Sequence, residues 1–418
     1  MVVSGYLNKS FPIGRVVRTL KNEIENQFIV INSHVYTREA KRTKLEKIKI
    51  ASRDLISLFK GVSNQLILRS SFIIVAPSRI NPIILLMIVI LGKRVSWLHM
   101  DNSYFCKSEY NFNRKTRKEC VECIESPNAH RIYSCKYPKS RILYPIYRLV
   151  YWILIHRRKD TRHLTQSEQS KALLEKYLKN KGVKQAIRTV GLASSDNHVR
   201  SYKLSASSVE FIDKVRGKFN MVLTFHGSAQ LSKGFFHIIL ISQFLNNTAF
   251  IAPFKKSDIE KEINLLDEKD EFLKIIRSSQ NIIYKPCTSN TGLLDLLALS
   301  DAQLIMSTWS APIEIAFSKT LQIPTPVITI DTSEYNTTGN YGKGIDQRED
   351  LLSLSMRGEQ VDYRNLAENI RKFILKSQQD KKDISKDRVI TPISENMIGY
   401  PGEEYVQKVL RAHGDQSK

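Results

Sequence analysis

Residues 219–330 alternate short apolar strands with polar loops and helical patterns, and three of these strands, at 219–225, 302–306 and 326–330, restrict the fold more than any other feature. The first strand, 219–225, leads into Gly227 and then into Lys233-Gly234 at the start of an apolar helix. Short continuous apolar strands that alternate with helices are typical of a parallel sheet buried on both faces. We therefore expect the carboxyl ends of the three strands to meet at one edge of a parallel sheet, where α/β proteins bind ligands.

The same alternation extends over the rest of the chain. Strands are expected at 28–32, 72–76, 94–99, 219–225, 248–253, 281–285, 302–306 and 326–330. Helices are expected at 13–25, 38–60, 82–91, 169–179, 234–245, 257–277, 291–300, 312–322, 362–377 and 403–412. The pattern predicts an α/β fold with two Rossmann-like parallel-sheet domains that face a cleft.

The length of 418 residues is too great for one ordinary hydrophobic core. A stretch rich in Ser, Asn and Asp near the middle of the chain reads as an interdomain linker. We expect a basic first domain at 1–190, a linker at 191–208, a second domain at 209–400 and a C-terminal helix and tail at 401–418.

The net charge of +23 is carried by the first half of the chain. Residues 1–200 hold 37 Lys and Arg against 14 Asp and Glu, whereas residues 201–418 hold 27 of each kind. Such asymmetry indicates that one domain faces a polyanion: a membrane surface, a nucleic acid or an anionic substrate. The alternative is a lysine-rich composition whose charges are simply solvated. No helix-turn-helix, RNP or zinc-finger spacing is present, so nucleic acid is not an expected partner.

The chain is expected in the cytoplasm. Its N-terminus lacks the basic-then-apolar pattern of a secretory signal. The most apolar run, 80–91, is shorter than the roughly 20 residues that span a bilayer. Five cysteines, an odd number, favour a reducing compartment.

The loop that follows strand 219–225 is a candidate diphosphate site with Gly227, Ser228, Lys233 and Gly234 as its residues. A glycine lets the backbone approach the ligand, a helix N-terminus offers free N–H groups, and a lysine supplies a fixed cation. The P-loop pattern GxxxxGK[ST] is absent. The alternative is an ordinary turn between a strand and a helix.

A second candidate segment follows strand 302–306 and contains Ser307, Thr308 and Glu314. The two hydroxyls can hydrogen-bond a phosphate or a ribose, and the Glu314 carboxylate can accept hydrogen bonds from sugar hydroxyls. The alternative for Glu314 is a first-turn carboxylate that stabilises a helix dipole.

Together the two segments resemble the donor-binding half of a GT-B glycosyltransferase, most closely glycosyltransferase family 4. The resemblance rests on Lys233-Gly234, on the strand that begins at Asp301 and on the ending Pro324-Thr-Pro-Val-Ile. The chain departs from the family where an arginine usually follows the first glycine, because Ser228 stands there. The two usual glutamates fall on Ala311 and Lys319, and only Glu314, three residues along, could replace one of them.

The first half carries the same resemblance through Leu98-His99-Met100-Asp101, an aromatic-Cys pair that ends at Cys106, and a later Cys-x-x-Cys. The resemblance implies that His99 lies at the interdomain cleft near the transferred sugar, with a catalytic role for His99 and Glu314. The alternative for His99 is a hydrogen-bonded histidine at a strand end.

Four thiols lie in one expected loop, 101–140: Cys106, Cys120, Cys123 and Cys135. Four thiolates suit a tetrahedral structural zinc, with no open position for a catalytic water. The alternative is a set of reduced thiols or a facultative disulfide.

Residues 144–159 pair Tyr and Trp side chains with a terminal His-Arg-Arg-Lys. Such a stretch is suited to an anionic membrane surface, because aromatic rings favour headgroup depth and basic side chains bind anionic lipid. The alternative is a buried helix with a solvated end.

The resemblance implies a transferase that moves a hexose from a nucleotide-diphosphate sugar to a lipid-linked or polysaccharide acceptor in surface glycan biosynthesis. It also implies retention of configuration and no required cofactor. The expected partners are the nucleotide sugar, a lipid-linked glycan acceptor and the inner face of the membrane. The alternative is a catalytically impaired GT-B-like binding or partner protein, which the missing arginine and glutamates favour.

Overall fold

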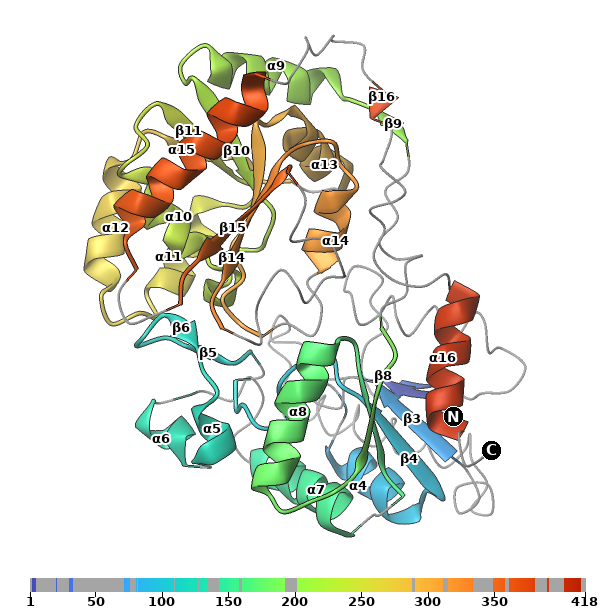
Figure 1. Ribbon diagram of the computed structural model, residues 1–418. Helices are drawn as coiled ribbons and strands as arrows, with labels where there is room; N and C mark the ends of the chain where they lie inside the picture. Colours follow the sequence, from blue (N-terminus) through green and yellow to red (C-terminus); the bar gives the residue numbers. More distant parts are fainter. Residues whose placement is uncertain are drawn as a thin grey trace, which may run out of the picture.

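The computed structural model of the chain has two lobes, one above the other in Figure 1. Each lobe is built on a six-stranded sheet. The structure describes residues 2–4, 20, 30–32, 71–75, 80, 82–108, 110–126, 128–133, 135, 143–157, 160–191, 201–287, 290–310, 315–333, 349–357, 361–379, 389–390 and 402–414.

The sheet of the first lobe is parallel throughout, with the strand order β2-β1-β3-β4-β7-β8. Its strands are β1 (Val2–Ser4), β2 (Val30–Asn32), β3 (Ser71–Val75), β4 (Arg94–Leu98), β7 (Arg162–Thr165) and β8 (Ala186–Thr189). One face packs on α4 (Pro82–Leu91), α7 (Leu143–Arg157) and α8 (Glu168–Asn180), and the other on α16 (Gly402–Gly414).

Alternate residues of β3 explain this layering. Phe72 and Ile74 belong to the core beneath α4, α7 and α8, whereas Ile73 and Val75 belong to the core beneath α16. Successive side chains of a strand point to opposite faces, so a strand that is apolar at every position needs cover on both sides.

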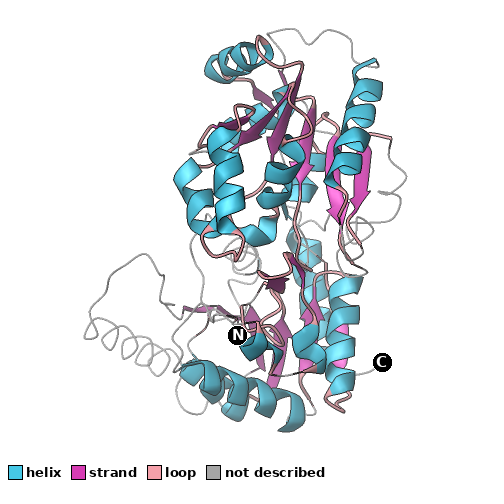
Figure 2. Ribbon diagram, turned by 90° about the vertical axis from the view of Figure 1, so that its left-hand side faces the viewer, coloured by secondary structure: helices cyan, strands magenta, loops and turns pink. Residues whose placement is uncertain are grey.

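The second lobe repeats this plan with the parallel order β12-β11-β10-β13-β14-β15. Its strands are β10 (Met221–Phe225), β11 (Thr248–Ala252), β12 (Ile282–Tyr284), β13 (Ala302–Ile305), β14 (Val327–Asp331) and β15 (Leu351–Ser355). The helices are α9 (Ala206–Arg216), α10 (Phe235–Ser242), α11 (Lys256–Ile263), α12 (Lys269–Ser278), α13 (Asn290–Leu299), α14 (Ile315–Leu321) and α15 (Tyr363–Gln379). Helices cover both faces of the sheet (Figure 2).

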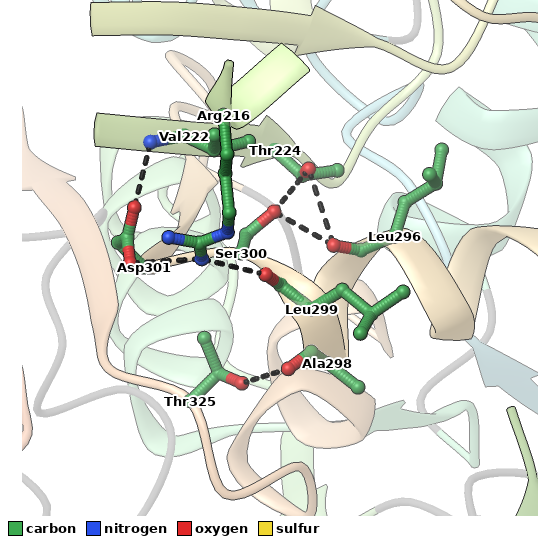
Figure 3. Close-up of polar contacts among 9 residues, drawn as sticks. All are labelled: Arg216, Val222, Thr224, Leu296, Ala298, Leu299, Ser300, Asp301 and Thr325. Carbon is green, nitrogen blue, oxygen red and sulfur yellow. Dashed lines mark hydrogen bonds and ion pairs between the residues drawn. The ribbon is translucent and has the colours of Figure 1, made fainter. Parts of the chain in front are cut away.

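Polar side chains secure the C-terminal end of α13 to the strands beside it (Figure 3). The carboxylate of Asp301 accepts hydrogen bonds from the Val222 N–H at 2.7 Å and from the Arg216 guanidinium at 3.0 Å. Arg216 also donates to the Leu299 carbonyl at 3.0 Å, and Ser300 donates to the Leu296 carbonyl at 2.7 Å. These side chains satisfy carbonyls that a helix end leaves without intrahelical partners.

The two parallel sheets are confirmed, and so is the alternation of strands and helices over the described residues. The expected helix 38–60, and the expected helix 13–25 apart from Leu20, lie outside the described residues. The expected helix 257–277 is wrong as a single element, since it is two helices, α11 and α12. α11 ends at Ile263, and the Asn264 side chain donates to the Glu260 carbonyl at 2.8 Å. An Asn side chain that bonds a nearby backbone carbonyl competes with the helical hydrogen bonds and so favours an end of the helix. Several elements were not expected, among them the sheet strands β1, β8 and β15 and the helix α9.

The domain boundaries 1–190, 191–208, 209–400 and 401–418 stay predictions. Within the expected linker, β9 (Tyr202–Lys203) pairs antiparallel with β16 (Val389–Ile390), and α9 begins at Ala206. In the part of the chain that the structure describes, no helix combines the length and the apolar content needed to cross a bilayer.

The C-terminal helix α16 lies on the first lobe (Figure 1). Arg162 of β7 donates to the carbonyls of Ala412 and His413 at 3.1 and 3.0 Å and so satisfies the end of the helix. His413 Nδ1 lies 2.7 Å from the Ser96 hydroxyl. Burial, together with the neighbouring positive charges, lowers the pKa of His413 to about 4.

The buried His413 predicts a loss of stability in acid. Its pKa is lower in the folded chain than in the unfolded chain, so the unfolded chain binds more protons between pH 6.5 and about pH 4. The free energy of unfolding should therefore fall as the pH drops through this window. Replacing His413 with Gln should make the fall near pH 5 shallower by about 1 kcal/mol per pH unit. Urea unfolding at several pH values measures both slopes, and equal slopes would contradict the assignment.

Candidate functional site

The predicted lysine loop lies directly after β10. A 3₁₀ turn, Leu231–Lys233, ends at Gly234, and α10 begins at Phe235. Gly234 has a φ of +77°, and a Cβ added there would lie 1.7 Å from the Met306 carbonyl oxygen. Only glycine meets both conditions, so Gly234 brings the loop against the end of β13.

The Ser-Thr loop after β13 packs on this lysine loop. The backbone N–H of Thr308 donates to the Ser232 carbonyl at 2.9 Å, and the Thr308 hydroxyl donates to the same oxygen at 3.2 Å. The Lys233 ammonium lies 5.6 Å from the centre of the Trp309 ring, within the range of a cation–π interaction. The structure therefore brings together Lys233 and Gly234 with Ser307 and Thr308, as their predicted roles require.

The position of the two loops in the sheet is that of a ligand site in an open α/β fold. The chain moves from β10 outward to β11 and β12, then returns to β13 beside β10 and continues to β14 and β15. The strand order thus reverses between β10 and β13, and the lysine and Ser-Thr loops follow these two strands. Crevices at such a switch point are where open parallel sheets bind ligands.

The other predicted donor residues differ in their placement. A Cβ at Gly227 would lie 2.4 Å from the Phe225 ring, so this glycine is required for packing as well as for any approach to a ligand. Ser228 is exposed. Glu314 lies outside the described residues, so its predicted role stays a prediction.

In the first lobe, His99 follows β4 directly and is only 3 % exposed. Its backbone N–H donates to the Leu164 carbonyl at 2.9 Å, and its Nε2 lies 2.9 Å from Nδ1 of His163. The Tyr104 ring meets the His99 ring edge-on, with the centroids 5.0 Å apart. Burial, and secondarily the nearby His163, hold the pKa of His99 well below its ordinary value. His99 is therefore neutral at pH 7.

Three buried polar side chains connect the lobes, and we call Asn102, Asn111 and Ser310 the interlobe clasp. The Asn102 amide donates to the Asn111 side-chain oxygen and to the Ser310 carbonyl, both at 2.8 Å. The Asn111 amide donates to the Ser310 hydroxyl at 2.9 Å, and the Ser310 N–H donates back to the Asn111 side-chain oxygen at 3.1 Å. Because Asn102 lies just beyond β4 and Ser310 just beyond β13, the carboxyl ends of the two sheets meet at the clasp.

A hairpin from the first half of the chain also packs on the second lobe. It consists of β5 (Phe112–Asn113) and β6 (Lys118–Glu119), and Phe112 belongs to the same hydrophobic core as Phe236 of α10. Arg117 in its turn forms an ion pair with Glu268 at 3.1 Å. Tyr110, just before the hairpin, meets the Trp309 ring edge-on at 4.7 Å. The expectation of an irregular region at 101–140 is thus wrong here, since the segment contains a hairpin and two short helices, α5 (Glu122–Glu125) and α6 (Ala129–Ile132).

The clasp predicts a large effect for one truncation. Replacing Asn111 with Ala removes its hydrogen bonds to Asn102 and Ser310 and leaves the buried Ser310 N–H without its partner. We expect the free energy of unfolding to fall by about 2–3 kcal/mol, since each buried unsatisfied group costs about 1–3 kcal/mol. Denaturant unfolding measures the change. Asn128→Ala is the matched control, because Asn128 is exposed and its side chain caps no helix; equal stability of the two variants would contradict the prediction.

The four thiols of the predicted zinc site lie in this same segment of the first lobe. Burial raises the pKa of Cys120 to about 11 and also raises the pKa values of Cys106, Cys123 and Cys135. All four are free thiols. Among the residues that the structure describes, no group of three or more His, Cys, Asp or Glu is placed to hold a metal ion. Structural zinc stays a prediction.

Two further residues of the candidate site were not predicted from the sequence. Gln166 follows β7 and Trp309 belongs to the Ser-Thr loop, and both are buried. The Gln166 amide nitrogen and the Trp309 indole nitrogen have no hydrogen-bond partner among the described residues. Buried donors without a protein partner are unusual, so both are candidates to bind a ligand. The sequence signal that could have identified these two residues is their position directly after strands.

No protein-family model and no curated protein matches this sequence. Solved structures do match over nearly the whole chain. HepE of Anabaena, in complex with UDP-glucose, aligns with a TM-score of 0.53 and 11% identity over 99% of this chain and 95% of that one. Sucrose-phosphate synthase of Thermosynechococcus elongatus aligns with a TM-score of 0.53 and 9% identity, over 99% of this chain and 96% of that one. A glycosyltransferase of Rickettsia africae aligns with a TM-score of 0.50 and 11% identity, over 99% of this chain and 96% of that one.

These likenesses extend over both lobes, since each covers 99% of this chain. The chain has the GT-B fold, as its resemblance to glycosyltransferase family 4 implied.

Proposed function

We propose that this chain is a retaining glycosyltransferase that moves a hexose from a nucleotide-diphosphate sugar to a lipid-linked or polysaccharide acceptor in surface glycan biosynthesis. The observation that carries the proposal is the position of Lys233 at the switch point of the second sheet, beside the N-terminal end of α10. A fixed cation and free backbone N–H groups suit the diphosphate. HepE, which has the same fold, binds UDP-glucose in its crystal structure.

The proposed chemistry is stabilisation of the departing nucleotide diphosphate. Negative charge grows on the leaving phosphate as the bond to the sugar breaks, and a cation already in place lowers the energy of that transition state. Lys233 fills this role in the proposal. His99 and Glu314 contact the sugar, Gly227 and Ser228 line the diphosphate loop, and Ser307 and Thr308 contribute hydroxyls. No metal or other cofactor is required for these steps.

The test is calorimetric titration with UDP-glucose, other UDP sugars and GDP sugars, followed by an assay for release of the free nucleotide. Binding of a nucleotide sugar with slow hydrolysis in water supports the proposal. Absence of binding by every nucleotide sugar would refute it.

A second candidate function is a sugar-nucleotide-binding or partner protein without catalysis. The observation that favours it is Ser228, at the position where the resembled family has an arginine. This candidate predicts the same titration curves with no nucleotide release, whatever acceptor is supplied. The release assay therefore separates the two functions.

We also propose that the first lobe contacts an anionic membrane surface on the inner face of the membrane. On α7, Leu149 and Trp152 are about half exposed, at 50% and 46%, and they lie on one stripe of the helix with the exposed His156. The neighbouring α4 exposes Ile83 and Ile90 at 49% and 60%. Half-exposed Leu, Ile and Trp side chains on two packed helices, in the basic half of the chain, suit an interfacial site.

This membrane proposal predicts weaker vesicle binding when the α7 stripe becomes polar. Replacing Leu149 and Trp152 together with Ser should lower partitioning to phosphatidylglycerol vesicles about tenfold or more, since burying one such side chain contributes about 1.5–3 kcal/mol. Co-sedimentation measures the change. Leu375→Ser is the matched control, because Leu375 is 47% exposed but lies on α15 of the second lobe. Equal binding by the stripe variant and the control would contradict the prediction.

A further inference from the structure

A hydrogen-bonded chain of three side chains ends at His99: His99 and His163 are buried, and Gln185 is half-buried. Nε2 of His99 lies 2.9 Å from Nδ1 of His163, and Nε2 of His163 lies 2.6 Å from the side-chain oxygen of Gln185. The Gln185 amide nitrogen donates to the carbonyls of Leu154 and Ile155 at 3.1 Å each. These carbonyls belong to the last turns of α7. The hydrogen-bonded side chains therefore connect the end of this helix with the carboxyl end of β4.

The two carbonyls determine the direction of every hydrogen bond in this chain. A carbonyl oxygen only accepts, so the Gln185 NH₂ group must face Leu154 and Ile155, and its oxygen must face His163. His163 must then carry its proton on Nε2. Burial lowers the pKa of His163 to about 4, so its ring is neutral at pH 7 and Nδ1 is a lone-pair acceptor. His99 must donate from Nε2.

A neutral His99 with its proton on Nε2 keeps a lone pair on Nδ1. The described residues give Nδ1 no hydrogen-bond partner, and it is not among their fully enclosed polar atoms that lack one. Nδ1 therefore borders space that solvent or a ligand can reach. Among the described residues, the titratable side chains whose rings contact the His99 ring are His163, Tyr104 and Tyr151, and none of them is charged at pH 7.

We infer that Gln185 and His163 are positioning residues that hold His99 in its Nε2–H tautomer, so that Nδ1 accepts a hydrogen bond from a hydroxyl of the sugar substrate. The identity of the ligand as a sugar rests on the proposed function, whereas the tautomer of His99 is a property of the protein alone. An uncharged acceptor favours a hydroxyl at this point and disfavours a carboxylate or phosphate, which could only face Nδ1 lone pair to lone pair.

The first test is ¹⁵N NMR of the histidine-labelled protein without ligand at pH 7.5, with His99 assigned from the spectrum of His99→Gln. The expected spectrum shows His99 and His163 both protonated on Nε2. A His99 ring protonated on Nδ1 would overturn the inference. The tautomers are read from the unmodified chain, and His99→Gln serves only to identify the His99 signals.

The second test is Gln185→Met, which removes the acceptor that holds the His163 proton on Nε2. His163 should then populate the Nδ1–H form, and His99 should shift toward its own Nδ1–H form in the same spectrum. With a nucleotide sugar that the protein uses, kcat/KM should fall about tenfold. Gln407→Met is the control, because Gln407 is exposed on α16, and its spectrum and activity should match those of the unmodified chain. Unchanged His99 tautomers in Gln185→Met would overturn the positioning role.

Failure of this inference is distinguishable from failure of the proposed function. If His99 and His163 have the expected tautomers but the protein binds no nucleotide sugar, the positioning role of Gln185 and His163 holds and the proposed function is wrong. If the protein transfers sugar while His99 is protonated on Nδ1, the proposed function holds and the inference about the tautomer is wrong.

Discussion

Replacing Lys233 with Ala is expected to lower kcat/KM for the nucleotide sugar about 100-fold, the low end of the effect of removing one preorganised group that stabilises transition-state charge. Lys233 ends the 3₁₀ turn before α10, and its ammonium lies 5.6 Å from the centre of the Trp309 ring. The side chain is thus held beside the Ser-Thr loop, and little reorganisation is needed when the diphosphate binds.

The sharpest measurement compares UDP with uridine. Uridine lacks the diphosphate, so Lys233→Ala should weaken UDP binding at least tenfold and leave uridine binding unchanged, since each tenfold corresponds to about 1.4 kcal/mol. Lys218→Ala is the control, because Lys218 is exposed and precedes the N-terminal end of β10, whereas the lysine loop follows the carboxyl end of this strand. UDP affinity that is equal in the two variants would remove Lys233 from the diphosphate site.

The strands around this site could be predicted from the sequence because buried parallel strands are read from continuous apolar runs. The bounds expected for β10, β11, β13 and β14 are nearly those observed. The lysine and Ser-Thr loops could be placed at one edge because parallel strands share their carboxyl ends. Short or half-exposed strands carry less signal, which explains why β15, with two exposed residues, was not expected.

The contacts between the lobes could not be predicted, because they depend on residues far apart in the sequence. Asn111 and Ser310 are 199 residues apart, and the sequence around either residue does not indicate that the other is its partner. Phe112 lies in a polar, cysteine-containing stretch, yet it packs in the core of the second lobe. The partners of His99 are equally remote: His163 is 64 positions away. Local patterns predict strands and helices, whereas such pairings are decided by how the lobes meet.

Replacing Gly234 with Ala is expected to reduce the free energy of unfolding by about 2–5 kcal/mol. Two separate penalties contribute. The φ of +77° is left-handed, which costs an L-residue with a Cβ about 1–2 kcal/mol. The added Cβ would also lie 1.7 Å from the Met306 carbonyl oxygen, and relieving that overlap costs about 1–3 kcal/mol in a packed site.

Two other glycines separate these penalties. Gly182 has a φ of +67° with no atom within 4 Å of an added Cβ, so Gly182→Ala measures the backbone penalty alone. Gly217 has an ordinary helical φ and only van der Waals contacts to an added Cβ, so Gly217→Ala should change stability by no more than about 1 kcal/mol. Denaturant unfolding of the three variants should rank Gly234→Ala as the least stable, then Gly182→Ala.

The overlap at Gly234 has a functional consequence as well as an energetic one. Met306 immediately precedes Ser307, so the Ser-Thr loop must move when the Met306 carbonyl yields to an added methyl group. Gly234→Ala should therefore weaken UDP binding in protein that is still folded, whereas Gly182→Ala should not. If Gly234→Ala were as stable as Gly182→Ala and bound UDP normally, the close packing of the lysine and Ser-Thr loops would not be what builds the site.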